Sequence, residues 1–165
     1  MKQELHDKTT KSIKDLQDQL EQMRIENNRF QKHMNDSIGF SAKLSANQYL
    51  YPAQRVPFGD VISNFGGHYS VDTYGFTCPV HGVYTFSMSI NQHDNDIIQG
   101  AIYRNNREVI RCLADNEGGY DSSSATVIVE GEAGDEVYVR VVGFDGKFDG
   151  NTSPCHFSGF LLHHL

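Results

Sequence analysis

Residues 82–90, GVYTFSMSI, alternate strictly between large apolar side chains and small or polar ones. The large members are Tyr84, Phe86, Met88 and Ile90, separated by Val83, Thr85, Ser87 and Ser89. A period of two places successive side chains on opposite faces of a β-strand, whereas an amphipathic helix needs a period near 3.6. The stretch therefore predicts a strand that buries one face in a sheet structure.

The first part of the chain has a different composition. Residues 1–36 contain no Gly or Pro, whereas all 15 Gly and all 4 Pro follow Ile38. Seven residues there follow one another at alternating steps of three and four, the seam of a coiled coil: Ile13, Leu16, Leu20, Met23, Asn27, Phe30 and Met34. We expect a helical trimerisation segment over 1–36 and a second domain over 37–165. A lone helix with a solvated face is the alternative, because about three heptads are short for independent stability.

Asn27 takes an a position in this seam. A single polar residue at such a position commonly fixes the register and the oligomer state at some cost in stability.

From Ile38 onward, short runs of period two follow one another at intervals of about ten residues. They cover residues 38–44, 82–90, 97–103, 108–113, 125–129, 137–142 and 157–162. Turn-forming pairs such as Gly66-Gly67, Gly118-Gly119 and Asp145-Gly146 separate them. Many short strands without intervening helices predict an all-β sandwich or barrel.

Charge and motif content exclude several functions. The chain has 165 residues and a formal net charge of −7, without a basic patch, which argues against nucleic acid as a partner. It has no apolar run of about 18 residues, so we expect no membrane insertion. Eight scattered His residues, with no motif that places a nucleophile beside a base, predict a protein that is not an enzyme.

The three cysteines, Cys78, Cys112 and Cys155, lack the spacing of a zinc site. They are either three half-buried small side chains, or one intrachain bridge with one free thiol. The two His residues near the end, His163 and His164, are expected in an exposed tail.

Three ordered blocks carry a family resemblance. The segment at 56–90, VPFGDVISNFGGHYSVDTYGFTCPVHGVYTFSMSI, is followed by AGDEVYVRV at 133–141 and FSGFLL at 157–162. The first block has the signature residues Phe58, Asn64, Tyr69, Phe76, Gly82, Tyr84 and Phe86. These blocks resemble the C1q globular-head domain over about residues 38–162. Met88 replaces the final aromatic of the signature, and His81 stands where the family usually has Pro.

The resemblance implies a jelly-roll β-sandwich of about ten strands, related to the tumour-necrosis-factor fold, that forms a homotrimer. It implies that the signature residues are structural, and that Phe76, Phe157 and Phe160 contribute to the core. The collagen tail of many members is absent, because no glycine-every-third pattern precedes the head. The helical segment takes its place, so we expect trimerisation mainly by the heads.

The resemblance also suggests a calcium site. The segment LADNEGGYDSSSA at 113–125 contains Asp115, Asn116, Glu117 and Asp121, whose oxygens suit calcium. Asp121 precedes Asp135 by the interval seen in adiponectin-like heads that bind calcium. Asp115 and Asp121 are the candidate ligands, and a solvated acidic loop is the alternative.

Loops at one end of the sandwich are the expected recognition surface, as the family's heads use them. They comprise residues 93–96, 116–122 and 143–156. Tyr120, Phe144, Lys147 and Phe148 are the candidate ligand-binding residues, because aromatic faces stack on sugar rings and Lys147 suits an anionic group. Aromatics tucked under their own loop are the alternative.

The function these features favour is that of a secreted, extracellular pattern-recognition protein of innate immunity. It would bind microbial glycans or surface molecules as a lectin-like trimer, since three weak sites gain avidity on a repetitive surface. The alternative is a signalling or scaffold ligand, cerebellin- or adiponectin-like, with a specific protein receptor.

Overall fold

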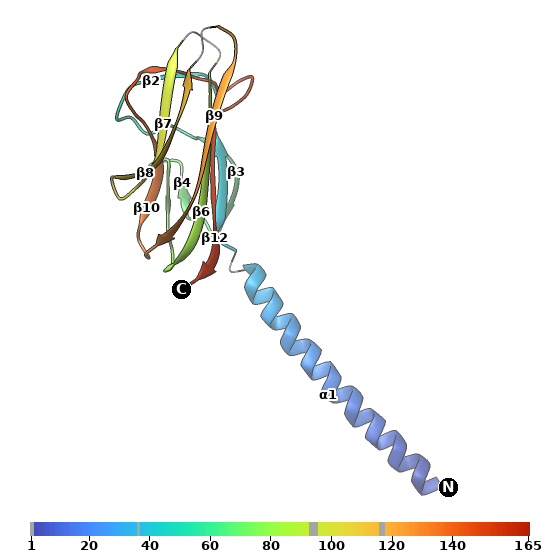
Figure 1. Ribbon diagram of the computed structural model, residues 1–165. Coiled ribbons are helices and arrows are strands. Elements are labelled where there is room, and N and C mark those ends of the chain that lie inside the picture. Colours follow the sequence, from blue (N-terminus) through green and yellow to red (C-terminus); the bar gives the residue numbers. More distant parts are fainter. Residues whose placement is uncertain (1, 36, 93–95, 116–117) are drawn as a thin grey trace. The chain divides into compact units, whose positions relative to one another are not determined.

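The computed structural model describes residues 2–35, 37–92, 96–115 and 118–165. The chain separates into two compact units, Met1–Ser37 and Ile38–Leu165. The first unit is helical, and the second is a β-sandwich (Figure 1).

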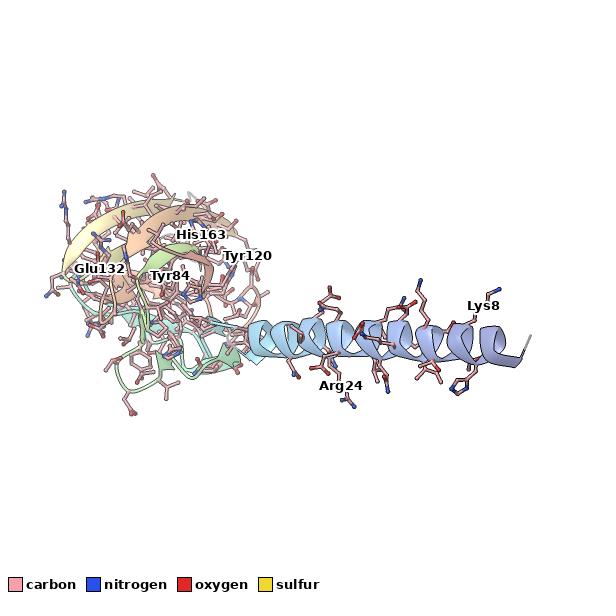
Figure 2. All side chains as sticks on the ribbon, turned by 90° about the horizontal axis from the view of Figure 1, so that it is seen from below. Lys8, Arg24, Tyr84, Tyr120, Glu132 and His163 are labelled. Atoms are coloured by element: carbon pink, nitrogen blue, oxygen red, sulfur yellow. The ribbon has the colours of Figure 1, made fainter. Side chains whose placement is uncertain are left out.

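The first unit is the helix α1, Lys2–Asn35. The helix expected from the seam pattern is confirmed, and the seam residues Ile13, Leu16, Leu20 and Met23 are between 49% and 63% exposed. Polar side chains such as Lys8 and Arg24 extend outward from the helix on different sides (Figure 2). Among the described residues, no helix combines the length and the apolar composition of a membrane span. An apolar stripe on a long polar helix is the surface that a second helix would cover.

The second unit consists of two antiparallel five-stranded sheets. In spatial order, the first sheet contains β3 (Asp60–Phe65), β1 (Gly39–Lys43), β12 (His156–His164), β6 (Gly82–Gln92) and β9 (Asp121–Gly131). The second sheet contains β4 (Tyr69–Ser70), β5 (Gly75–Thr77), β10 (Glu136–Val141), β7 (Ile97–Arg104) and β8 (Arg107–Asp115). A short pair, β2 (Gln48–Leu50) with β11 (Gly146–Phe148), stands beside them. The expected all-β sandwich is confirmed (Figure 1).

Strand β6 confirms the alternation from which the β fold was predicted. Tyr84, Phe86, Met88 and Ile90 are fully buried, while the residues between them are half-buried on the opposite face. The buried side chains meet those of the second sheet in one continuous core. Each buried side chain of this size contributes about 1.5–3 kcal/mol to folding.

The signature residues before β6 hold a loop against this core. The side-chain amide of Asn64 donates to the carbonyl oxygen of Tyr69 at 2.9 Å, and its oxygen accepts from the Tyr69 backbone N–H at 3.1 Å. The Tyr69 hydroxyl donates to the carbonyl oxygen of Phe58 at 2.9 Å. The Tyr69 ring stacks on Phe40 with 4.6 Å between centroids. Asn64 and Tyr69 therefore close the 64–69 turn and fix it to strand β1.

Strand β12 corrects one expectation about the core. Phe157 is fully buried, but Phe160 is 52% exposed and lies on the outer face of the first sheet. Residues three apart in a regular strand point to opposite faces, so both rings cannot enter the same core. Gly159 occupies the inward position beside Phe86, where a Cβ would be 2.3 Å from Phe86 Cδ1.

The C-terminal residues His163 and His164 are exposed, but they belong to β12 and pair with Val83 and Gly82. The expected tail is thus the end of a strand.

All three cysteines are free thiols in the buried interior, which decides between the alternatives left open by the sequence. Burial raises the pKa of Cys78 and of Cys155 to about 12. A thiol with such a pKa is protonated at neutral pH and is a poor nucleophile. The cysteines therefore act as small core side chains.

Candidate functional site

The four predicted ligand-binding residues lie in different environments. Tyr120 is 68% exposed and Phe144 is 46% exposed, so both rings are available to a ligand. Lys147 is half-buried in β11, and its backbone N–H donates to Asp96 Oδ2 at 3.0 Å. Phe148 is fully buried in the main core. Its ring cannot contact a ligand, so the prediction that Phe148 binds a ligand is corrected: it is a core residue.

A hollow of about 300 Å³ brings two of the predicted loops together. It is lined by Asn91, Gln92, Tyr120, Asp121, Ser122, Thr152 and Ser153. Residues 93–95 and 116–117 of the predicted recognition loops lie outside the described residues. The hollow combines an exposed aromatic ring with hydroxyl, amide and carboxylate groups, which is the chemistry that binds a sugar.

Gln92 belongs to this hollow and was not predicted from the sequence. It is completely buried, and neither amide atom has a hydrogen-bond partner among the described residues. A buried amide without partners is costly, so its position needs an explanation. In sequence, Gln92 lies two residues after Ile90 and so continues the series of every second residue of β6 that faces inward. That spacing could have predicted its burial.

Asp149 orders one wall of the hollow. Its carboxylate is buried and accepts backbone N–H bonds from Asn151 at 2.8 Å, Thr152 at 3.1 Å and Ser153 at 3.1 Å. Asp side chains often bind the backbone of the following residues in this way. The Asp149 carboxylate thus fixes the two hydroxyl residues that line the hollow.

The candidate calcium ligands Asp115 and Asp121 are close together at the ends of β8 and β9. Asp121 Oδ2 accepts from the Asp115 backbone N–H at 2.8 Å, and Oδ1 accepts from the Ser122 backbone N–H at 2.8 Å. The Asp121 carboxylate thus fixes the turn, and each oxygen retains a second lone pair that a cation can use. The neighbouring Asn116 and Glu117 lie outside the described residues.

Asp135 does not join this pair. Asp121 begins β9, and Asp135 follows the other end of that strand. Its carboxylate instead accepts from the Asn105 side chain at 2.5 Å and from the Glu132 backbone N–H at 3.0 Å. The sequence interval between Asp121 and Asp135 therefore does not bring their carboxylates together.

A further cluster of titratable groups was missed by the sequence reasoning. His81 Nε2 lies 2.8 Å from Glu130 Oε1 and 3.5 Å from Glu132 Oε1. The hydrogen bond to Glu130 raises the pKa of His81, and the charge of Glu132 acts in the same direction. One imidazole and two carboxylates can hold a divalent metal such as zinc. An ion pair of protonated His81 with the two glutamates accounts for the same geometry.

The outer face of the first sheet carries a row with exposed apolar side chains beside a row of small hydroxyl side chains. One cross-strand row contains Phe65, Gly39, Phe160, Thr85 and Ile128, and the next contains Ser63, Ser41, Ser158, Ser87 and Thr126. Phe65, Phe160 and Ile128 are between 52% and 65% exposed. A shallow hollow of about 300 Å³ lies over β12, β6 and β9 on this face. An apolar face of this kind is typical of a protein interface.

Comparisons with known proteins agree with this architecture. The model of the C1q domain family matches residues 39–162. Complement C1q tumor necrosis factor-related protein 2 of Mus musculus is 30% identical over 118 residues, which are 68% of this chain and 40% of that protein. Complement C1q tumor necrosis factor-related protein 7 of the same species is 33% identical, with the same two coverages. The chain thus spans about two fifths of the length of these curated relatives.

Solved structures show the same fold at low sequence identity. The globular domain of zebrafish complement 1qA protein matches with a TM-score of 0.66 and 18% identity, over 79% of this chain and 100% of that chain. Eiger TNF from S. frugiperda matches with a TM-score of 0.66 and 13% identity, over 78% and 94%. The family match covers the β-sandwich except for the last two residues of β12, and it agrees with the resemblance seen in the sequence. The chain therefore belongs to the C1q domain family, which is non-enzymatic, and has the C1q/TNF-like fold.

Proposed function

We propose that this chain is a secreted recognition protein that binds glycans of microbial surfaces as a homotrimer. The observation that carries the proposal is the loop-end hollow, where the exposed Tyr120 ring stands beside the hydroxyls of Ser122 and Thr152. Sugar recognition uses an aromatic face for the ring and polar groups for the hydroxyls. The curated relatives are C1q/TNF-related proteins, and innate immunity is the role we infer for this one.

Homotrimerisation supports such a role. The apolar outer face of the first sheet offers Phe160 and Ile128 to a second copy. The seam of α1 offers a second contact through Leu16 and Leu20. Three identical sites on one rigid assembly raise the avidity for a repetitive surface, even where each site is weak.

Calcium at Asp115 and Asp121 belongs to the proposal. An ion between them would use the free lone pairs of the Asp121 carboxylate and the exposed Asp115 side chain. A chelator is then expected to lower the melting temperature of the calcium-loaded protein. An unchanged melting temperature would remove calcium from the proposal.

The experiment is an array of glycans and microbial polysaccharides, probed with the purified protein in calcium and in chelator. We expect selective binding that is lost in Tyr120→Ala and retained in the control Phe144→Ala, since both rings are exposed but Tyr120 alone lines the hollow. A blank array in both conditions would contradict the proposal.

The second candidate function is that of a ligand for a protein receptor, similar to cerebellin or adiponectin. An exposed aromatic pair favours it: the Tyr49 and Tyr51 rings lie 5.3 Å apart edge to face and are 52% and 55% exposed. Exposed tyrosines are enriched in protein interfaces. Nanomolar capture of one cell-surface protein, lost in a Tyr49→Ser and Tyr51→Ser double variant, would favour this function.

A further inference from the structure

The outer face of the second sheet carries a row of arginines. Arg55 is paired with Arg140, Arg140 with Ala101, and Ala101 with Arg111, so these side chains lie on the same face of neighbouring strands. Like charges directly opposite one another destabilise a sheet. In a chain with a net charge of −7, such a row needs a specific explanation.

Two tyrosines form a platform beneath the row. Tyr138 and Tyr103 are stacked with 5.8 Å between centroids and are 2% and 5% exposed. The guanidinium carbon of Arg55 lies 3.6 Å above the Tyr138 ring, and that of Arg140 lies 4.0 Å above the Tyr103 ring. Cation–π contacts therefore hold both guanidinium groups over the tyrosine rings.

The tyrosine rings are themselves fixed at their far ends. The Tyr138 hydroxyl donates to Asn106 Oδ1 at 2.7 Å, and the Tyr103 hydroxyl donates to Glu108 Oε2 at 3.2 Å. A guanidinium that lies on a fixed ring loses little conformational freedom when it binds a ligand. The platform thus orders the arginines in advance of any partner.

Carboxylates neutralise the charge of two of the three arginines. Arg55 forms a bidentate pair with Glu136 at 2.7 and 2.8 Å, and Arg111 forms one with Glu108 at 2.5 and 2.6 Å. Arg140, between them, forms no direct ion pair or hydrogen bond with a carboxylate among the described residues, and its buried Nε has no acceptor there. The Glu108 carboxylate, which is paired with Arg111, acts on Arg140 through its charge alone. An unpaired buried N–H costs stability and calls for an explanation. The middle of the row therefore has a fixed positive charge in excess.

We propose that Arg140 is an anion-binding subsite for an acidic polysaccharide, whose carboxylate or sulfate groups it binds. The planar guanidinium matches both oxyanions with two parallel N–H bonds. The proposal rests on the glycan recognition proposed above but uses a different surface. A polymer with repeated negative charges suits it, because the subsite recurs in each copy of the chain and single weak contacts add through avidity.

The test is calorimetric titration of the full chain with short probes that cannot bridge copies. The probes are a hyaluronan tetrasaccharide, which carries carboxylates, and sucrose octasulfate, which carries sulfates. Neutral maltotetraose and hexaglutamate, an acidic peptide, are the comparison probes. We expect binding of at least one acidic probe, and no binding of maltotetraose that depends on Arg140. Arg140→Gln should weaken acidic binding about tenfold, in line with the loss of one charge-assisted pair. The control Arg107→Gln, an exposed arginine at the start of the same sheet's β8, should change affinity less than about twofold.

Two further variants separate a lost subsite from a lost fold. Arg140→Lys keeps the charge but not the planar fork, and we expect an intermediate loss. Glu108→Gln keeps an acceptor for the Tyr103 hydroxyl and frees Arg111, so we expect acidic binding to strengthen several-fold. A gain of binding cannot arise from unfolding.

Three outcomes would overturn the inference. They are equal affinities of Arg140→Gln and Arg107→Gln for the acidic probes, Arg140-dependent binding of maltotetraose, and Arg140-dependent binding of hexaglutamate without binding of any acidic saccharide. Binding of neutral glycans that is lost in Tyr120→Ala but retained in Arg140→Gln, together with no binding of the acidic probes, would support the proposed function and contradict this subsite. The two proposals therefore fail independently.

Discussion

At the scale of single residues, Gly159 shows how tightly β12 packs on β6. A Cβ at this position would lie 2.3 Å from Phe86 Cδ1 and 3.0 Å from the Thr85 carbonyl oxygen. We expect Gly159→Ala to lower the free energy of unfolding by about 2–3 kcal/mol, because the core has no room for the methyl group. The control is Gly59→Ala, where the nearest atom is 3.8 Å away and a change below about 0.5 kcal/mol is expected. Urea denaturation measures both, and equal values would contradict the packing argument.

His81 gives the stability of the sandwich a dependence on pH. Its two glutamate neighbours raise the pKa of His81 above the ordinary value of about 6.5. A raised pKa means that the folded state holds the proton more tightly. The stabilisation is thus fully present below the unfolded pKa and is lost as pH rises through the folded one. We expect the melting temperature of His81→Gln to fall below that of the parent by more at pH 6 than at pH 9.

His156 is a control, because its effect on stability should change with pH in the opposite direction. Burial lowers its pKa, so its contribution is present at high pH and is lost as pH falls through the lowered value. Removing it in His156→Gln should make the protein less sensitive to acid. The same sign of pH effect in both variants would contradict the assignment.

The alternation of side chains along a strand explains which residues could be assigned to the core or to the surface from the sequence. The inward series of β6 was predictable because every second residue is large and apolar. Phe160 was misplaced because its block contains apolar residues on both faces, although its separation of three from Phe157 excludes a shared face. Arg140 could not be recognised, because its significance depends on Arg55 and Arg111 from distant strands.

At the scale of elements, most strands of five or more residues were predicted, whereas β3 and the shortest strands were missed. The runs that became β6, β7, β8, β9, β10 and β12 alternate over enough residues to show a period. The pairs β4–β5 and β2–β11 involve strands of two or three residues. Such strands are too short to show an alternation of apolar and polar residues, and they are defined only by their pairing with a neighbouring strand. The loop-end hollow is unpredictable for the same reason, since it joins residues 91–92, 120–122 and 152–153.

The helix α1 is expected to strengthen the trimer rather than to create it. Its apolar seam, residues 13–34, covers about three heptads, which is marginal for an independent coiled coil. The sandwich has its own apolar face. We expect deletion of residues 1–36 to leave a trimer that dissociates at higher protein concentration than the parent. Light scattering over a dilution series measures this, and a monomeric head at all concentrations would contradict it.

At the scale of the whole molecule, three surfaces of the sandwich have separate chemistries. The outer face of the first sheet carries the apolar row of Phe65, Phe160 and Ile128, and the outer face of the second carries the arginine row. The loop end carries the Tyr120 hollow. If the apolar face binds other copies, the two polar surfaces stay accessible in the trimer. Trimer formation and ligand binding then use different surfaces of the sandwich.

Phe160 tests this division directly in the full chain. The ring is 52% exposed at the centre of the apolar row, between Gly39 and Thr85. Phe160→Glu should place a charge in the trimer interface, where an unpaired charge is costly, and shift the protein toward monomer. The fold should persist, because the side chain points away from the core. Light scattering with circular dichroism measures both effects.

The control Phe144→Glu changes a ring of similar exposure on a loop and should remain trimeric. A trimeric Phe160→Glu, or equal dissociation of both variants, would place the interface elsewhere.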